Sequence, residues 1–293
     1  MSRATTRLGF VEPQLLSRTD QPPQRSGWIH EVKHDGYRTL LVIERGNVCY
    51  TRNGFDWNER YPGIISAAGE LRFRAAILDG EVIVQDERGV SDFEALSAAI
   101  RWLPHTLRFY AFDILHLNGE DLRDQPLLDR RTKLKGLLGR DRTSPLQFSD
   151  EFIGDSAAFF RACAKHGLEG VVSKLASSRY RSGRSKTWLK SKCFTESDLV
   201  IIGTDRDRKT GATRALLANA DLTYAGAAFI GLRGDAWHAL HERLQQIAIK
   251  RAPLTGLRIK GAQWVKPTIT ARVRHLAGGN YLRHAVVKRL EQN

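Results

Sequence analysis

Five strand-like runs in the first part of the chain constrain its fold more than any other feature. Between residues 28 and 118, the runs WIHEVKH, YRTLLVIE, VCYTRN, AAILDGEVIVQD and LRFYAFDILHLN are rich in β-branched and aromatic residues. Gly, Asn or Asp interrupts them at short intervals, which is typical of β-strands joined by turns. The polar segment before them, residues 17–26, contains two prolines and is predicted to be a loop.

Three other segments have the pattern of helices. SDFEALSAAIRWL starts with the capping pair Ser91 and Glu94, and PLLDRRTKLKGLLG ends in glycine. DSAAFFRACAKHG has Asp155 as its expected N-cap and Gly167 as its expected stop. Strands and helices do not alternate strictly, so the pattern predicts an α+β fold with antiparallel sheets and flanking helices.

The pattern changes near Thr195. DLVIIGTDRD, ATRALLANAD and LTYAGAAFIG indicate short strands, and a helix is expected from about Asp235 to Ile249. QWVKP and TITARVRH indicate two further strands. Short strands with one helix in so small a segment predict a closed β-barrel of the OB type. We therefore expect two domains, residues 1–194 and residues 195–293.

The positive charge of the chain is concentrated in its C-terminal part. The formal net charge is +14, and from Asp198 onward 16 basic residues stand against 7 acidic ones. Such a surplus suits a domain that lies along the phosphates of a nucleic acid. On charge alone, an ordinary Arg-rich protein from a GC-rich genome explains the composition equally well, so this alternative stays open here.

The cysteines and the apolar residues argue against several classes of protein. Cys49, Cys163 and Cys193 lie far apart without CxxC spacing, which disfavours structural zinc or a disulfide framework and favours the reducing cytoplasm. No run of about 18 apolar residues is present, so no membrane span is expected. The N-terminal segment MSRATTRLGF lacks the apolar core of a secretory signal.

Six short motifs carry the candidate chemistry, and each is a weak signal by itself. A lysine in a turn is usually solvated, a strand-end carboxylate is usually paired, and an aromatic strand usually belongs to a core. The order of the six along the chain is more specific than any one of them. The motifs are KHDG with Lys33, TRNG with Arg52, LDGEV with Glu81, FYAFD with Phe112, EGVVSK with Glu169 and Lys174, and KTWLKSK with Lys190 and Lys192.

The last motif is the hardest to explain by structure alone. On a strand, Lys186, Trp188, Lys190 and Lys192 would share one side, because side chains alternate between the two faces. Three like charges on one face repel one another. An anionic partner is therefore expected at this face.

Together the motifs supply the parts of a nucleotide-activating site. Like-charge repulsion from Lys190 and Lys192 would lower the pKa of a nucleophilic Lys33, and the same two lysines would bind phosphate oxygens. A divalent metal on Glu169 would neutralise charge developing on a triphosphate. In EGVVSK, strand alternation places Glu169 and Lys174 on opposite faces unless the strand twists or bulges.

The series KHDGYR, TRNG, LDGEV, FYAFDIL, EGVVSK and KTWLKSK resembles the nucleotidyltransferase motifs of DNA ligases and capping enzymes. The wording is most similar to ATP-dependent DNA ligases, above all in YAFDILHLNGEDL. The lead-in FVEPQLLSRTDQPPQRSGWIHEVKHDGYR and the segment LRHAVVKRL resemble the ligase module of bacterial end-joining ligases. The resemblance implies an adenylation (nucleotidyltransferase) domain at residues 1–194 and an OB-fold domain at residues 195–293.

The resemblance also implies a reaction and a role for each matching residue. Lys33 would attack the α-phosphorus of ATP and form lysyl-AMP. AMP would then pass to the 5′-phosphate of nicked or broken double-stranded DNA, and the 3′-hydroxyl would seal the strand. The implied nucleotide-binding residues are Glu31 for adenine, Phe112 for stacking on the base, Arg38 and Glu81 for the ribose, Arg52 for phosphate including that of the nick, and Lys174, Lys190 and Lys192 for the nucleotide phosphates. Glu81 and Glu169 would hold Mg²⁺ or Mn²⁺.

The biological setting implied by the resemblance is DNA repair by end joining. The protein would act as a cytoplasmic monomer with Ku as a partner, and a mobile joint near residues 194–198 would let the two domains rearrange. The family usually ends its barrel domain with a basic RxDK motif, whereas this region reads LRHAVVKRLEQN. Arg283, Lys288 and Arg289 are the candidate replacements, and slower self-adenylylation is expected.

Two other functions stay open at this point. An RNA ligase or RNA guanylyltransferase shares the lysine chemistry, although its motif wording differs from FYAFDIL. A non-catalytic DNA-binding protein on a degenerate scaffold is the third candidate, but binding alone needs no nucleophile such as Lys33.

Overall fold

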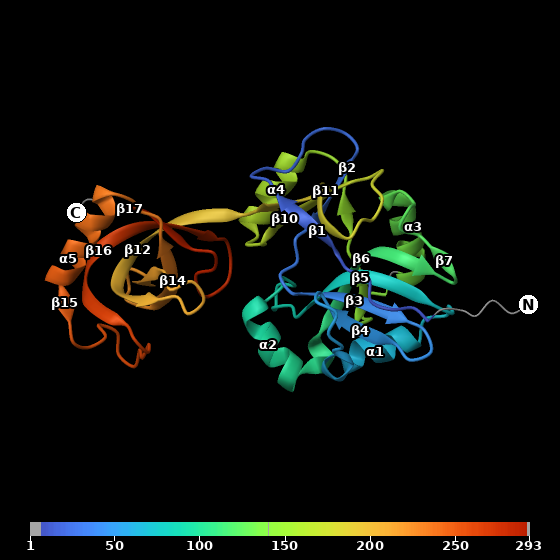
Figure 1. Ribbon diagram of the computed structural model, residues 1–293, viewed down its shortest axis with the longest axis horizontal. Coiled ribbons are helices and arrows are strands. Elements are labelled where there is room, and N and C mark those ends of the chain that lie inside the picture. The colour runs from blue at the N-terminus through green and yellow to red at the C-terminus, as the bar shows by residue number, and fades with distance from the viewer. Residues whose placement is uncertain (1–6, 140, 292–293) are drawn as a thin grey trace, which may run out of the picture. The chain divides into compact units, whose positions relative to one another are not determined.

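The computed structural model describes residues 7–139 and 141–291. The chain divides into two compact units, unit 1 (Met1–Lys192) and unit 2 (Cys193–Asn293), shown in Figure 1. Both units combine sheets with a small number of helices, and the expected α+β class is confirmed. No helix in the described ranges has the length and apolar character needed to cross a membrane.

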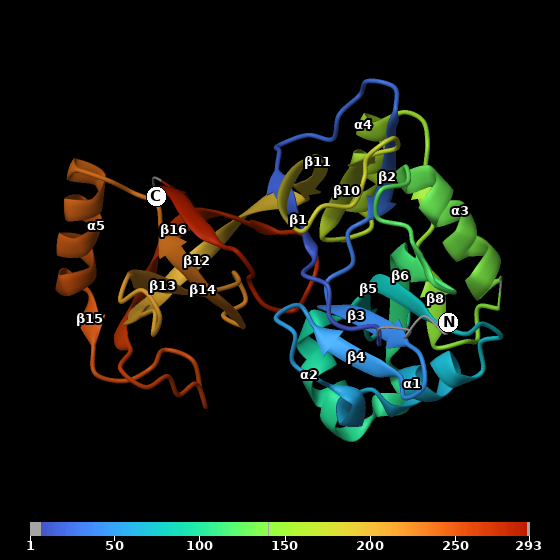
Figure 2. The same ribbon diagram turned by 45° about the vertical axis from the view of Figure 1, so that its right-hand side comes forward.

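Unit 1 contains two sheets, which Figure 2 shows one above the other. Most neighbouring strands are antiparallel, as expected, and the exceptions are the pairs formed by Gln14–Arg18 and Leu146–Phe148. The first sheet has the order β1 (Gln14–Arg18), β11 (Gly183–Lys192), β10 (Gly170–Leu175), β2 (Trp28–Val32) and β9 (Glu151–Phe152). The second has the order β4 (Val48–Thr51), β3 (Tyr37–Ile43), β5 (Ala76–Ile83), β6 (Arg108–Leu117) and β7 (Glu120–Asp121), with β8 (Leu146–Phe148) beside β6.

The two sheets face each other across a shared apolar layer. Leu40 and Val42 of β3 lie in this layer, together with Ile29 of β2 and Trp188 of β11. Leu41, between them in the sequence, points to the opposite face and packs in a second core. The run LLVI is apolar throughout because both faces of β3 are buried. This arrangement places the ends of strands from both sheets around one space.

The helices of unit 1 are α1 (Pro62–Gly69), α2 (Phe93–Trp102), α3 (Leu127–Leu138) and α4 (Ser156–Lys165), with short 3₁₀ turns at Asn58–Arg60 and Pro104–Thr106. The Asp155 carboxylate accepts hydrogen bonds from the N–H groups of Ala157 and Ala158, so the predicted N-cap of α4 is confirmed. Gly139 follows α3 with φ of 66°, a conformation that glycine adopts without strain.

The predicted capping pair of α2 is wrong. The N-cap is Asp92, whose carboxylate accepts from Ala95 N–H at 3.0 Å. Ser91 Oγ instead accepts from Asp35 N–H at 3.1 Å. The serine hydroxyl thereby ties the start of α2 to the loop that follows Lys33.

Part of the predicted loop at residues 17–26 is also wrong. Ser17 and Arg18 belong to β1, which runs parallel to β11. Parallel pairing joins segments that lie far apart in the sequence, so the local polar pattern could not reveal it.

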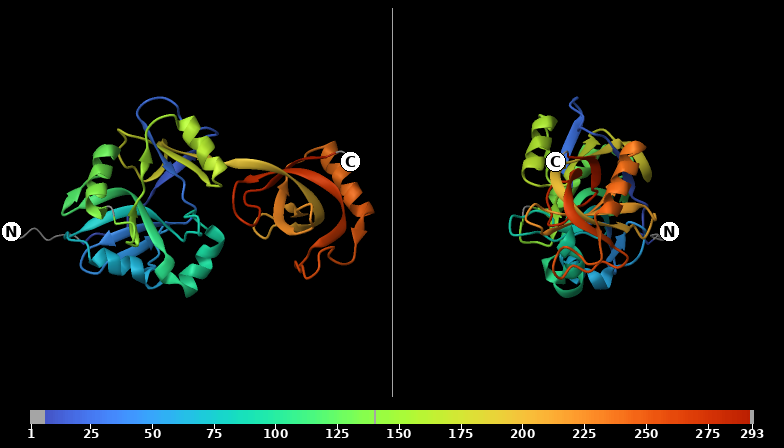
Figure 3. Two further views of the ribbon diagram at one scale, coloured as in Figure 1. Left: turned by 180° about the vertical axis from the view of Figure 1, so that it is seen from behind. Right: turned by 90° about the vertical axis from the view of Figure 1, so that its left-hand side faces the viewer.

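Unit 2 is a small barrel, visible in Figure 3. Its elements are β12 (Phe194–Arg206), β13 (Thr213–Ala218), β14 (Tyr224–Ile230), α5 (Asp235–Gln246), β15 (Ala248–Ile249), β16 (Gln263–Leu276) and β17 (Val286–Leu290). The sheet order is β12-β13-β14-β17-β16-β15, and β12 also pairs with β16. This last pairing closes the sheet, so the predicted OB-like barrel is confirmed.

One expectation for unit 2 is wrong in detail, and the residues of the expected joint lie in a strand. The two strands expected in QWVKP and TITARVRH are one strand, β16, despite Pro267. Pro267 lies where the pairing of β16 with β12 is interrupted, so its missing N–H breaks no ladder bond. Residues 194–198, expected to form a joint, are paired with residues 272–276 within the barrel. The break between β11 and β12 falls at Cys193.

Candidate active site

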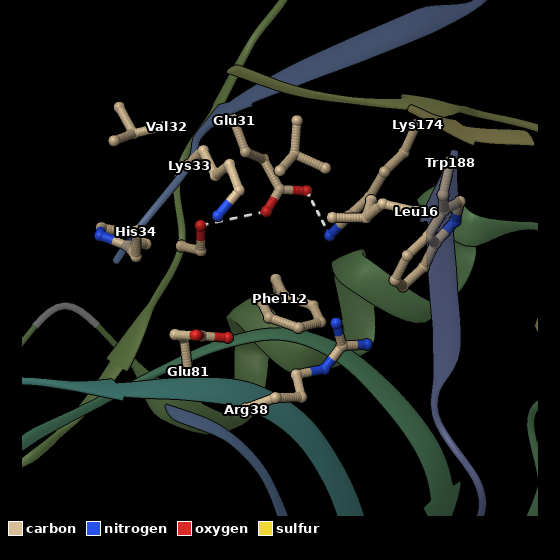
Figure 4. A pocket seen from close by; sticks show the side chains of 12 residues that line it. Leu16, Glu31, Val32, Lys33, His34, Arg38, Glu81, Phe112, Lys174 and Trp188 are labelled. Carbon is tan, nitrogen blue, oxygen red and sulfur yellow. Dashed lines mark hydrogen bonds and ion pairs between the residues drawn. The ribbon is translucent and has the colours of Figure 1, made fainter. Parts of the chain in front are cut away.

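A pocket lies in unit 1 between the two sheets (Figure 4). Both sheets contribute side chains to it, so neither sheet alone could form it. The lining residues are Leu16, Glu31, Val32, Lys33, His34, Arg38, Glu81, Phe112, Ser149, Val172, Lys174 and Trp188.

Lys33 follows β2 directly, and its ammonium group contacts the Glu169 carboxylate. The other oxygen of Glu169 lies 2.8 Å from Lys192 Nζ. Burial would raise the pKa of Glu169, but Lys33 and Lys192 together hold it below its ordinary value. Glu169 therefore stays ionised between two cations.

Lys190 adds a third positive charge at this end of the cavity. Burial lowers the pKa of Lys190, and repulsion from Lys33 and Lys192 lowers it further. One carboxylate, Glu169, is shared among these lysines. The local surplus of positive charge favours an anionic group such as a phosphate.

Two glycines allow the close backbone contacts that assemble this end. A Cβ on Gly36 would lie 2.2 Å from the Val82 carbonyl oxygen, so only glycine lets the loop after Lys33 approach β5. A Cβ on Gly170 would lie 2.1 Å from the Ser191 carbonyl oxygen. Gly170 thus brings the segment that carries Glu169 against β11.

Another part of the cavity is built around the buried Glu31 carboxylate. Lys174 Nζ lies 2.7 Å from Glu31 Oε1, and Arg131 Nη1 donates to the same oxygen at 3.1 Å. Ser149 Oγ donates to Oε2 at 3.1 Å. These partners balance the buried negative charge of Glu31 and fix the orientation of its carboxylate.

Phe112 forms the apolar wall of the cavity. Its ring centroid lies 4.1 Å from Lys174 Nζ and 4.5 Å from the Arg38 guanidinium carbon. Trp188 packs edge-on against Phe112, with ring centroids 6.0 Å apart. Arg38 is held in place by two hydrogen bonds to the Asp79 carboxylate, of 2.5 and 2.7 Å. A planar apolar ligand would find an aromatic surface here with fixed cations around it.

Glu81 faces the same cavity from β5. Burial raises its pKa to about 7, while Lys33 and Arg38 act in the opposite direction and Glu169 adds to the increase. Glu81 and Glu169 therefore lie close enough to interact. Within residues 7–139 and 141–291, no group of three or more His, Cys, Asp and Glu side chains is gathered for a metal. A metal at this site would need further ligands from a bound phosphate.

The structure does not bring every predicted residue to the cavity. Arg52 is exposed in the turn after β4 and does not line it. Lys186 is exposed and Trp188 is buried. Trp188, Lys190 and Lys192 lie at alternate positions of the ladder with β10, so these three share one side of β11 as expected. The pairing of β1 with β11 jumps from Ser185 to Leu189, which interrupts regular alternation. Lys174 lies with Glu31 and Glu169 lies with Lys33, so both face the same cavity. Glu169 precedes β10, so the strand alternation that would place it opposite Lys174 does not extend to it.

The environment of His34 predicts how the stability of the protein changes at low pH. Burial lowers the pKa of His34 to about 4, although its side chain is not fully inaccessible. The unfolded chain takes up this proton near pH 6.5 and the folded one only near pH 4, so stability falls as the pH drops between these values. Between these pH values, the free energy of unfolding of a His34→Gln variant should fall by about 1–3 kcal/mol less than that of the wild type.

The measurement is urea unfolding at pH 7 and pH 4.5 without nucleotide. The matched control is His238→Gln, because His238 is exposed in α5. An equal loss of stability in wild type and His34→Gln would show that His34 is protonated in the folded protein.

Two family models match the chain. The model of the ATP dependent DNA ligase domain matches residues 14–192. The model of the ATP dependent DNA ligase C terminal region matches residues 209–293. The first match includes all the cavity-lining residues.

Curated proteins and solved structures agree with these matches. The multifunctional non-homologous end joining protein LigD of Pseudomonas aeruginosa is 37% identical over 97% of this chain, which corresponds to 36% of LigD. The SPbeta prophage-derived DNA ligase-like protein LigB of Bacillus subtilis is 31% identical, over 74% of this chain and 78% of LigB. The structure of mycobacterial DNA ligase D complexed with ATP and MES has a TM-score of 0.61 and 29% identity, covering 95% of this chain and 94% of that one.

The chain spans about a third of the length of the LigD proteins that it matches. The matched domain models together cover both units, and the predicted motifs lie within them. The chain belongs to the ATP-dependent DNA ligase family.

Proposed function

We propose that this protein seals 5′-phosphate/3′-hydroxyl nicks or breaks in double-stranded DNA through a lysyl-AMP intermediate on Lys33. The observation that carries the proposal is the position of Lys33 at one end of a two-sided cavity. Its ammonium group contacts Glu169, which also binds Lys192, and Lys190 lies within electrostatic range. Phe112 and Glu31 line the same cavity. Residues 1–194 would act as the adenylation domain and residues 195–293 as the OB-fold domain.

The residues of the cavity suit the parts of ATP in order. The Phe112 ring would stack on adenine, and the Glu31 carboxylate would accept a hydrogen bond from its 6-amino group. Arg38 and Glu81 would contact the ribose. Lys190 and Lys192 would bind the phosphates, and the Lys33 amine would attack the α-phosphorus. Lys174 lies beside Glu31, which supports a role for this lysine at the adenine ring in place of the expected contact with the nucleotide phosphates.

A divalent cation fits the two carboxylates at the phosphate end. Glu81 and Glu169 supply oxygen ligands within electrostatic range of each other, and Mg²⁺ commonly takes one or two carboxylates plus substrate phosphates. Mn²⁺ accepts the same ligands. When bound, the cation would neutralise charge that develops on the triphosphate.

We further propose that the pathway is end joining. The support is the similarity to LigD proteins, whose names describe non-homologous end joining. A monomer acting at broken ends with Ku in the cytoplasm fits this pathway. Exposed Arg52 would contact the 5′-phosphate of the break, since it lies outside the nucleotide cavity.

The direct test of sealing uses a duplex with one nick and a labelled 5′-phosphate. With ATP and Mg²⁺ we expect joined DNA, and with GTP or without nucleotide we expect none. Sealing of an RNA nick but not of a DNA nick would support an RNA ligase. Covalent labelling by GTP but not ATP would support a capping enzyme, and DNA binding without either reaction would support the non-catalytic alternative.

DNA binding and self-adenylylation should respond differently to salt. If the basic unit 2 lies along DNA phosphates, affinity for nicked DNA should fall at least about 100-fold between about 50 and about 200 mM salt. Self-adenylylation involves no DNA and should change much less. Equal salt dependence of both steps would contradict a phosphate-contacting role for unit 2.

A further inference from the structure

Arg131 lies in α3, yet its side chain is only 2% exposed and reaches both sheets of unit 1. Its Nη1 donates to the Phe112 carbonyl oxygen at 2.9 Å and to Glu31 Oε1 at 3.1 Å. Its Nη2 donates to the Ser149 carbonyl oxygen at 2.6 Å and to the Glu151 carboxylate. One guanidinium therefore joins β6 of the second sheet to β2 and β9 of the first.

The two groups that Arg131 joins form opposite walls of the cavity. Phe112 is the aromatic wall on one sheet, and Glu31 is the buried carboxylate on the other. A guanidinium is planar and presents its donors at fixed angles, so it sets both the separation and the orientation of the groups it binds. Lys174 also reaches Glu31, but its Nζ lies over the Phe112 ring, and its flexible stem does not fix the angles between its partners as a guanidinium does.

We propose that Arg131 is a positioning residue that sets the spacing of Glu31 and Phe112 and thereby the preference of the site for adenine. This inference rests on the proposed roles of Glu31 and Phe112. Adenine offers a 6-amino donor to a carboxylate, whereas guanine offers a 6-oxo acceptor that a carboxylate repels. The selection works only while the base is held on Phe112 at the correct distance from Glu31.

The test compares ATP with purine riboside triphosphate, which lacks the 6-amino group. Self-labelling of the wild type should favour ATP by about 10–100-fold in kcat/KM, as expected for one hydrogen bond to a charged group. In Arg131→Lys the ratio should fall to within about 3-fold, mainly through a higher KM for ATP. A ratio of two nucleotides does not depend on how much of the variant is folded.

The matched control is Arg130→Lys. Arg130 is the preceding residue of α3 and is fully buried, but it binds Asp113 and the carbonyl oxygens of Gln125 and Ser178. None of these partners lines the cavity. We expect Arg130→Lys to keep the wild-type ratio even where it lowers stability. A wild-type ratio in folded Arg131→Lys would overturn the proposal.

Glu151→Gln provides a second route if Arg131→Lys does not fold. Glu151 is 23% exposed and is one of the two carboxylates that hold Arg131. Glu151→Gln should lower the ratio of kcat/KM for ATP to that for purine riboside triphosphate by at least about twofold. An unchanged ratio would overturn the proposal. Failure of the proposed function would give a different result. Either the wild type would take no AMP label, or Glu31→Gln would keep the wild-type ratio of ATP to purine riboside triphosphate.

Discussion

A Lys33→Ala variant is expected to lose sealing of an ordinary nick by at least about 10,000-fold, because no other group can replace the nucleophile. The same variant should still seal a nick whose 5′-phosphate already carries AMP. That step joins the 3′-hydroxyl to the activated phosphate and needs no attack by Lys33. Gel assays on the two substrates under identical conditions measure both effects.

Lys186→Ala is the matched control for Lys33→Ala. Lys186 belongs to the lysine-rich motif on β11 but is exposed and does not line the cavity. Its loss should change ATP-dependent sealing by less than about threefold. If Lys33→Ala failed equally on both substrates while folded, Lys33 would be needed for DNA positioning as well as for nucleotide transfer.

The largest effect on stability is expected at the buried pair of Asp113 and Arg130. Both side chains are fully buried and share two hydrogen bonds, of 2.8 and 2.7 Å. Asp113→Asn leaves the Arg130 charge uncompensated in the interior, which should cost about 3–5 kcal/mol of unfolding free energy. Urea unfolding measured by circular dichroism gives this value directly.

Replacing both members of the pair separates the charge effect from packing. Arg130→Met with Asp113→Leu removes both buried charges, and we expect it to recover most of the stability lost in Asp113→Asn. The exposed pair of Arg181 and Asp124 is the control, and Asp124→Asn should leave the unfolding free energy close to that of the wild type. Equal losses at the two pairs would show that burial does not determine the cost.

Much of the fold could be predicted from local patterns. The runs from Tyr37 to Leu117 form strands because apolar side chains fill both faces of the second sheet, as in β3. The ordered motifs also predicted which residues meet, since Glu169 contacts both Lys33 and Lys192 although the three come from distant parts of the chain.

The residues that sequence reasoning missed act through long-range contacts. Arg131 reads as an ordinary surface arginine in DRRTKLK, and nothing in that pattern indicates that it is buried against Glu31 and Phe112. The position of Lys174 also depends on tertiary structure, because the pairing of β10 with β2 brings it to Glu31. Strand β1 was missed for the same reason, as its partner β11 lies more than half the chain away.

The identity of the nucleophile can be tested with ATP that carries its label on the α-phosphate. The protein is incubated with this ATP and Mg²⁺, denatured and digested, and the labelled peptide is identified by mass spectrometry. We predict a covalent, acid-labile AMP on Lys33, which is absent from Lys33→Ala. With ATP labelled on the γ-phosphate the protein should take up no label, because that phosphate leaves with pyrophosphate. AMP attached to any other residue, or ATP-dependent sealing by a protein that never takes the label, would contradict the assignment of Lys33 as the nucleophile.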